Sequence, residues 1–306
     1  MASKAEKLRA ILKEDRCHMV PCCWDALSAK MIGDAGFPFT FMSGFAVSAA
    51  RLGLPDTGLI SYAEMAGQLR DICAATPIPV IGDGDTGYGN ALNVERTVRG
   101  YAQAGAACVM IEDQLAPKRC GHTKGKLVVD RAEAVDRIRA AAHARDEVRR
   151  AGGDILILAR TDARGVDSLD EAVWRANAFR DAGADILFVE APQSEAEMVR
   201  ITKEAPGIHM ANMVEGGKTP IPPMGRLREL GFNLAIFPLT LFSASMRAIA
   251  TSLAAMKTER HPADQLMSFD DLKRTVGFDA YYDAESRYAG ARKDAALVEV
   301  EANDLV

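Results

Sequence analysis

Acidic side chains follow several short apolar runs of this 306-residue chain. Asp83 and Asp85 come after one run, Glu112 ends the next, and Asp56 lies in the segment "RLGLPDTG". Carboxylates crowded into one place repel unless they are protonated or neutralised. A hard divalent cation that keeps several waters would neutralise them, and Mg²⁺ is typically held by one or two carboxylates and its substrate. We therefore expect these four residues to form a Mg²⁺ site, with Mn²⁺ as the alternative ion. The competing interpretation is that Asp85 and Asp113 cap the helices that follow.

Cys120 lies in an unusual setting for a cysteine, the stretch "EDQLAPKRCGHTKGK". Its neighbours are mostly cations or histidine: Lys118, Arg119, His122, Lys124 and Lys126. Nearby positive charge favours the thiolate, so a thiol placed here is suited to proton transfer. We expect Cys120 to take part in chemistry and the other five cysteines to be free thiols. His122 is either a solvated loop residue or a substrate contact.

Arg160 ends the apolar run "DILILA". It could be a structural partner of Asp162 or Glu190, or it could clamp a carboxylate through two parallel hydrogen bonds. Glu190 and Asn212 also follow apolar runs, and Asn212 has the same two interpretations as His122. A metal, an arginine and a thiol together indicate a small anionic substrate in which a carbon–carbon bond is polarised.

Eight short apolar runs alternate with segments of helical periodicity. The runs cover residues 18–22, 37–42, 80–82, 108–111, 154–159, 185–189, 209–211 and 233–237. Several helical segments close on a glycine directly before the next run, as in "QAGAACVMIE" and "DAGADILFVE". This alternation favours an α/β protein with a (β/α)8 TIM-type barrel, in which functional side chains collect at the carboxyl ends of the strands. The rival is a doubly wound open sheet, but the first strand turn lacks a glycine-rich phosphate-binding motif.

The alternation stops near residue 263, where "MSFDDLKRTVGFDAYYDAESRYAG" predicts one or two extra helices. We therefore predict a catalytic barrel over 1–262 and a helical extension over 263–306. The net charge is −5 without a long run of like charge, which argues against nucleic acid and anionic membrane as partners. The sequence predicts no signal peptide and no transmembrane helix, so we expect a cytoplasmic protein.

The motifs of this chain occur in the order of a known family. They are "MSG", "GLPDTG", "GDGDTGYG", "IEDQ", "KRCGH", "ARTDA", "ANMVEGGKTP" and "FPL". With them the chain resembles the isocitrate lyase/phosphoenolpyruvate mutase superfamily from about residue 17 to 256, and it looks most similar to 2-methylisocitrate lyases and 2,3-dimethylmalate lyases. Each motif is weak by itself, whereas the ordered series is specific.

The resemblance implies a role for each matching residue. Asp85 would contact Mg²⁺, while Asp56, Asp83 and Glu112 would hold its waters. The 2-oxo-acid half of a small carboxylic-acid substrate would bind at Ser43, Gly44, Phe45 and Arg160, and the other half would face Gly121, His122, Glu190 and Asn212. Cys120 would lie on a gating loop. Family members usually form homotetramers, dimers of dimers that exchange a C-terminal helix between subunits.

The implied reaction is cleavage of the C2–C3 bond of a 2-hydroxy di- or tricarboxylate. Cys120 would protonate the departing carbanion as the general acid, and Mg²⁺ and Arg160 would stabilise charge on the oxo-acid side. Val214 stands where the tricarboxylate lyases have a hydroxyl residue, and Phe41 where they have tyrosine. These departures favour 2,3-dimethylmalate, giving pyruvate and propionate, over 2-methylisocitrate, giving pyruvate and succinate.

Two alternatives to this reaction remain open. The first is an oxaloacetate decarboxylase or hydrolase of the same superfamily, although Pro238 stands where we would expect a serine in the hydrolases. The second is a non-catalytic barrel used for ligand sensing or as an oligomeric scaffold.

Overall fold

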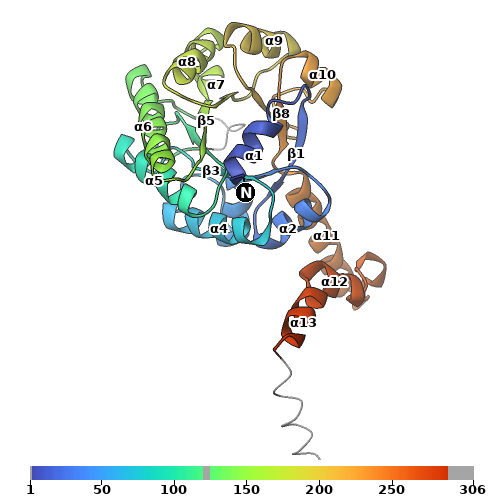
Figure 1. Ribbon diagram of the computed structural model, residues 1–306. Coiled ribbons are helices and arrows are strands. Elements are labelled where there is room, and N and C mark those ends of the chain that lie inside the picture. The colour runs from blue at the N-terminus through green and yellow to red at the C-terminus, as the bar shows by residue number, and fades with distance from the viewer. Residues whose placement is uncertain (1, 120–124, 289–306) are drawn as a thin grey trace, which may run out of the picture. The chain divides into compact units, whose positions relative to one another are not determined.

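Eight parallel strands form the centre of the molecule in the computed structural model, which describes residues 2–119 and 125–288 (Figure 1). The strands are β1 (His18–Cys23), β2 (Thr40–Met42), β3 (Val80–Asp83), β4 (Cys108–Glu112), β5 (Leu156–Thr161), β6 (Ile186–Val189), β7 (Met210–Asn212) and β8 (Leu234–Phe237). Each apolar run identified in the sequence overlaps one of them, with bounds that differ by up to three residues.

The strand order shows that the sheet is a barrel. Neighbouring strands pair in the order β6-β5-β4-β3-β2-β1-β8-β7. The two end strands meet through a parallel bridge between Leu187 and His209, and the amide of Leu187 donates to the carbonyl of Ile208 at 2.8 Å. The barrel is therefore nearly closed, which confirms the predicted TIM-type fold and excludes the open sheet.

Helices surround the strands in Figure 1. They are α1 (Lys4–Ile11), α2 (Ala26–Asp34), α3 (Gly44–Leu52), α4 (Tyr62–Ala75), α5 (Ala91–Gln103), α6 (Arg131–Arg150), α7 (Ala163–Val166), α8 (Leu169–Asp181), α9 (Glu195–Glu204) and α10 (Met224–Glu229). The next helix, α11 (Thr240–Lys257), follows β8. Many of these helices are capped at their N-termini by a side chain. At α4, for example, Ser61 and Glu64 form a capping box. Gly105 and Gly183 have φ of 91° and 107° after α5 and α8, so the predicted turns from helix to buried strand are confirmed.

The period-two alternation of side chains along each strand decides which residues face the barrel interior. On β4, Cys108 and Met110 belong to the interior core, so Glu112 continues the inward row. On β5, Leu156 and Leu158 are interior, so Arg160 continues that row.

The opposite end of the barrel is covered by α1 (Figure 1). Leu8 of this helix and Leu12, its C-cap, pack into the same interior core. At the carboxyl ends of β4 and β5 the inward rows end in the charged residues Glu112 and Arg160.

The chain divides into two compact units, Met1–Met246 and Arg247–Val306. Described helices of the second unit are the end of α11, the short 3-10 helix η1 (Ala263–Gln265), α12 (Phe269–Val276) and α13 (Phe278–Ser286). Gly277, with φ of 93°, joins α12 to α13. Helices are thus present where the sequence predicts extra ones, and the boundary at residue 262 stays a prediction. Within the described residues, no helix is both long and apolar enough to cross a membrane.

Candidate active site

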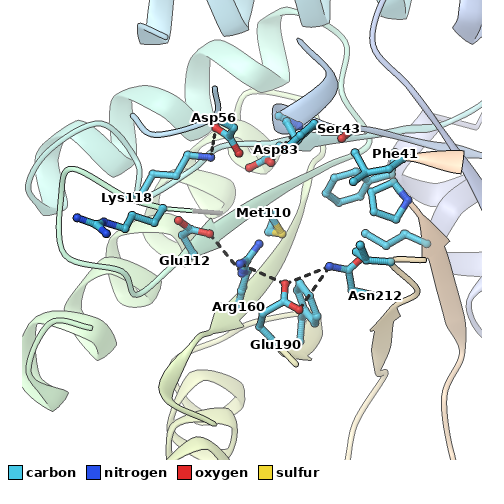
Figure 2. Close-up of a pocket in the computed structure, with 18 residues that line it drawn as sticks. Phe41, Ser43, Asp56, Asp83, Met110, Glu112, Lys118, Arg160, Glu190 and Asn212 are labelled. Carbon is cyan, nitrogen blue, oxygen red and sulfur yellow. Dashed lines mark hydrogen bonds and ion pairs between the residues drawn. The ribbon is translucent and has the colours of Figure 1, made fainter. Parts of the chain in front are cut away.

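A pocket opens at the carboxyl ends of the strands, with about 580 Å³ of empty space that includes open solvent (Figure 2). Its lining includes nine residues predicted from the sequence: Ser43, Gly44, Phe45, Asp56, Asp83, Glu112, Arg160, Glu190 and Asn212. Asp85 is not in the lining but is joined to it through Lys118. The predicted site residues Cys120, Gly121 and His122 lie outside the described residues.

Lys118 connects two of the predicted metal-site carboxylates. Its Nζ lies 2.5 Å from Asp56 Oδ1 and 2.7 Å from Asp85 Oδ1. The three side chains are buried, and Figure 2 shows the lysine reaching Asp56 across the pocket. Sequence reasoning treated Lys118 only as a cation near Cys120, and so missed this contact.

Asp83 organises the backbone around these carboxylates. Its side chain accepts hydrogen bonds from the amides of Gly44 at 3.2 Å and Asp85 at 3.0 Å. The hydroxyl of Tyr101 donates to its carbonyl at 2.7 Å. A Cβ at position 44 would lie 2.4 Å from Asp83 Oδ2, so this close approach requires glycine. Asp83 therefore fixes the start of α3 and the turn that carries Asp85.

Burial makes three of these carboxylates hard to ionise. It raises the pKa of Asp83, raises that of Asp85 to about 7, and raises that of Glu112 well above its usual range. Lys118 opposes these shifts only in part. For the ammonium itself, burial lowers the pKa, but Asp85 and Asp56 raise it well above the ordinary value. Lys118 is therefore charged, and additional positive charge would stabilise the ionised form of the carboxyl groups around it.

The cluster fits a magnesium ion that keeps part of its water shell. All four side chains offer hard oxygen atoms, and Glu112 Oε1 is buried without a hydrogen-bond partner among the described residues. Over that same part of the chain, no three His, Cys, Asp or Glu side chains are arranged to ligate one ion together. Direct ligation by few carboxylates, with the others bonded to waters, agrees with both observations.

Neither Asp85 nor Asp113 begins the helix that follows it, so the capping alternative is wrong. The N-cap of α5 is Asn90 and that of α6 is Asp130. Asp113 lies next to Glu112 and points away from the interior, where it accepts hydrogen bonds from Thr161 Oγ1 at 2.6 Å and Arg175 Nη1 at 3.0 Å. Asp113 is therefore a structural residue.

Three carboxylates surround Arg160, which also lines the pocket. Its Nε and Nη2 donate to Asp162 at 2.8 and 3.1 Å. Nε also lies 3.3 Å from Glu112 Oε2, and Nη2 lies 3.2 Å from Glu190 Oε2 (Figure 2). Both sequence-based partners, Asp162 and Glu190, are thus in contact with it. The two-pronged Nε–Nη2 edge is occupied by Asp162, and Nη1 forms no hydrogen bond with another described residue.

Lys126 completes the charge balance around Asp162. Its Nζ lies 2.5 Å from Asp162 Oδ1, and both side chains are buried. Burial raises the pKa of Asp162, but Arg160 and Lys126 outweigh it and lower the pKa to about 2. Asp162 is therefore ionised at neutral pH and orients Arg160. The sequence offered no signal for this role of Lys126, because loop residues have no periodicity.

The remaining wall of the pocket combines one polar pair with apolar side chains. Asn212 Nδ2 donates to Glu190 Oε2 at 3.1 Å, and its buried Oδ1 has no hydrogen-bond partner among the described residues. The apolar side chains nearby are Phe41, Met110, Phe188, Val214, Ile236, Pro238 and Leu239. Part of the substrate space is therefore suited to hydrocarbon rather than to charge.

Comparison with known proteins identifies the family of this chain. The model of the family "Phosphoenolpyruvate phosphomutase" matches residues 8–257. The chain belongs to this family. It is 40% identical over 291 residues to 2,3-dimethylmalate lyase of Eubacterium barkeri, covering 94% of this chain and 99% of the relative. The superfamily resemblance drawn from the motifs is thus confirmed.

Other relatives carry different reaction names. Carboxyvinyl-carboxyphosphonate phosphorylmutase of Arabidopsis thaliana is 40% identical, covering 94% of this chain and 85% of the relative. A 2-methylisocitrate lyase of Aeropyrum pernix is 38% identical, covering 94% and 91%.

Solved structures of family members show the same spread of names. A structure of oxaloacetate acetylhydrolase with 3,3-difluorooxalacetate superposes with a TM-score of 0.89 at 32% identity, covering 94% of this chain and 98% of the other. Phosphonopyruvate hydrolase with oxalate and Mg²⁺ gives 0.81 at 27% identity, covering 94% and 99%. The family and fold are thus shared by enzymes of several activities.

Proposed function

We propose that this chain is a magnesium-dependent carbon–carbon lyase that cleaves a small 2-hydroxy dicarboxylate to a 2-oxo acid and a second carboxylate. One observation carries the proposal: the pocket brings a cluster of carboxylates that favours a cation together with Arg160, whose Nη1 has no hydrogen bond to another described residue. The similarity to 2,3-dimethylmalate lyase and 2-methylisocitrate lyase supports the reaction class.

The oxo-acid half of the substrate would bind between α3 and Arg160. Ser43 caps α3, and Gly44 and Phe45 form its first turn in the pocket lining. The amide of Gly44 is bonded to Asp83, whereas that of Phe45 has no hydrogen-bond partner among the described residues. Amides at a helix N-terminus favour anions, so a substrate carboxylate would be held by this turn and by Arg160 Nη1.

The cation, held by Asp85 with Asp56, Asp83 and Glu112 around its waters, would polarise the substrate oxygens and lower the pKa of the hydroxyl group when bound. Glu190 and Asn212 face the other half of the substrate, with Gly121 and His122 proposed to join them. Cys120 would protonate the carbanion released by C2–C3 cleavage as the general acid. Lys118 and Lys126, which lie on either side of this cysteine in the sequence, are both buried beside the pocket, which supports its presence there.

The apolar wall favours 2,3-dimethylmalate over 2-methylisocitrate. The succinate half of methylisocitrate carries an additional carboxylate, and burying it beside Val214 or Phe41 without a hydrogen-bond donor is unfavourable. A methyl group suits the same wall. The products would then be pyruvate and propionate.

An activity on oxaloacetate is the second candidate, because the oxaloacetate acetylhydrolase structure superposes closely on this chain. Pro238 lines the pocket, at a position where the family resemblance leads us to expect a serine in such hydrolases. Decarboxylation of oxaloacetate needs no thiol acid, so Cys120 separates these reactions experimentally.

We also propose that the chain acts in the cytoplasm as a homotetramer, with the extension over 263–306 packing on a neighbouring subunit. Its described helices expose large apolar side chains, among them Phe269 and Tyr281. Sedimentation velocity would show a tetramer for the full chain and a smaller species for a chain ending at residue 262. A tetramer from the shortened chain would contradict the proposed contact.

The decisive experiment measures 2-oxo-acid release from 2,3-dimethylmalate, 2-methylisocitrate, isocitrate and oxaloacetate, with Mg²⁺ and with EDTA. We expect 2,3-dimethylmalate to be preferred and EDTA to abolish turnover.

Cys120→Ser should lower carbon–carbon cleavage by about 100-fold to 10,000-fold. Cys73→Ser, a change outside the pocket, is its control. Turnover of oxaloacetate alone, unaffected by Cys120→Ser, would refute the lyase. No turnover and no Mg²⁺-dependent thermal shift would favour the sensing or scaffold alternative.

A further inference from the structure

The Lys118 ammonium occupies oxygen atoms that a divalent cation at this site would need. Its Nζ lies within 2.7 Å of one carboxylate oxygen on each of Asp56 and Asp85, and the side chain is only 6% exposed. Both an ammonium and a divalent ion are attracted to a carboxylate by charge. Two cations at the same buried oxygen atoms also repel each other strongly, because the surroundings screen them poorly.

We infer that Lys118 is a tethered counter-cation of the carboxylate cluster and competes with the divalent cation for Asp56 and Asp85. The inference rests on the proposed magnesium site. Lys118 then stabilises the cluster when free metal is scarce, at the expense of metal affinity. Binding of the ion requires Nζ to leave these oxygens, which couples metal binding to the chain segment that carries the lysine.

The charge balance of the pocket makes Lys118 the principal cation at this end. Asp56, Asp83, Asp85 and Glu112 are each less than a tenth exposed, and buried like charges need a counter-charge. The guanidinium of Arg160 approaches Glu112 but is shared with Asp162 and Glu190. Removing the lysine would therefore leave negative charge that a divalent ion can offset.

The backbone beside Lys118 is anchored, so its position is built into the fold. Gln114 Nε2 donates to the carbonyl of Arg119, and the amide of Arg119 donates back to Gln114 Oε1, both at 2.9 Å. Arg137 Nη1 in turn donates to the carbonyl of Gln114 at 2.9 Å. These bonds hold the residue that follows the lysine against the end of β4.

Lys126 provides a matched control within the same loop. It is also a buried lysine, but its Nζ contacts Asp162, which is not one of the proposed metal-site carboxylates. Lys118→Met and Lys126→Met therefore delete the same charged group at two buried sites, and only the first deletion removes a competitor for the metal.

The test titrates Mg²⁺ into EDTA-treated, dialysed full-length protein by calorimetry and records thermal unfolding with and without Mg²⁺. We expect Lys118→Met to bind Mg²⁺ at least about tenfold more tightly than wild type, since a nearby repelling charge is lost. Its Tm in EDTA should fall and be restored by Mg²⁺. Lys126→Met should lose stability in both conditions and keep the wild-type Kd. If Lys118→Met does not fold in EDTA, Lys118→Gln is used instead, starting from metal-loaded protein. Its Tm is measured at a series of Mg²⁺ concentrations, and the concentration that gives half of the stabilisation is compared with that of wild type.

The outcomes separate this inference from the proposed function. Wild-type protein that binds Mg²⁺, together with a Lys118 variant that binds it equally or more weakly, overturns the competition and leaves the lyase standing. Wild-type protein that binds no Mg²⁺ overturns the metal site and the inference together.

Discussion

Two buried aspartates near the same pocket have pKa values displaced in opposite directions. Asp85, beside β3, has a pKa raised to about 7, whereas Asp162, beside β5, has a pKa lowered to about 2. Burial acts in the same sense on both. The difference lies in the counter-charges, because Asp162 is held by the fork of Arg160 and by Lys126, while Asp85 shares Lys118 with Asp56. Counter-charge, more than burial, decides what each region can bind.

The two regions therefore have complementary roles. The carboxylate cluster around Asp85 lowers its free energy by gaining positive charge, so it suits a cation. The cluster around Asp162 is already balanced, and its Arg160 lines the pocket, so it suits an anion. A metal-bound carboxylic acid satisfies both at once.

The largest expected effect on activity comes from removing one charged group from each region in turn. Arg160→Gln and Asp85→Asn should each lower kcat/KM by about 1000-fold, because each removes a group that stabilises charge in the transition state. Calorimetry should show that Asp85→Asn loses Mg²⁺ binding and that Arg160→Gln retains it. Loss of Mg²⁺ binding in both variants would mean that the regions act as one site, and the comparison would fail.

Asp162→Asn should destabilise the protein by about 3 kcal/mol, because it leaves Arg160 and Lys126 buried without their anion. Urea unfolding measures the change, and Asp167→Asn, at an exposed position of the neighbouring turn, is the control. An effect no larger than that of the control would show that Asp162 does not balance these cations.

Acid should remove the contribution of Asp162 in a defined pH range. Its folded pKa of about 2 lies below the ordinary value of 3.8, so the unfolded chain binds the proton first. The stabilisation is complete above about pH 4 and declines as the pH falls toward 2, amounting to about 2 kcal/mol. Unfolding free energies across this range should fall more steeply for wild type than for Asp162→Asn. Equal slopes would contradict the lowered pKa.

The smallest expected effect concerns the apolar wall beside the two charged regions. Val214→Thr keeps the side-chain size and replaces one methyl group with a hydroxyl group, so it should raise the preference for 2-methylisocitrate relative to 2,3-dimethylmalate by about tenfold. Competing-substrate assays give the ratio of kcat/KM values directly. Val214→Ala controls for space, and an equal change in that variant would show that polarity is not the cause.

Much of the fold could be predicted from the sequence because it depends on local patterns. Apolar runs and the glycines before them located all eight strands, and the ordered motifs identified the family. Bounds were less accurate where a run begins outside the sheet: residues 37–39 precede β2, although Phe39 packs in the core. Strand pairing begins only where the neighbouring strand is aligned, which a run of apolar residues does not reveal.

The sequence by itself determined which strand-end residues face the pocket. Side chains alternate along a strand, so Glu112 and Arg160 had to continue the inward rows of β4 and β5, while Asp113 had to point outward. Only the tertiary structure decided the electrostatics. Lys118 and Lys126 come from a loop without periodicity, and their contacts with particular aspartates depend on how that loop folds back over the barrel. Because the pKa of a buried carboxylate follows its nearest counter-charges, opposite displacements at Asp85 and Asp162 could not be predicted from residue order.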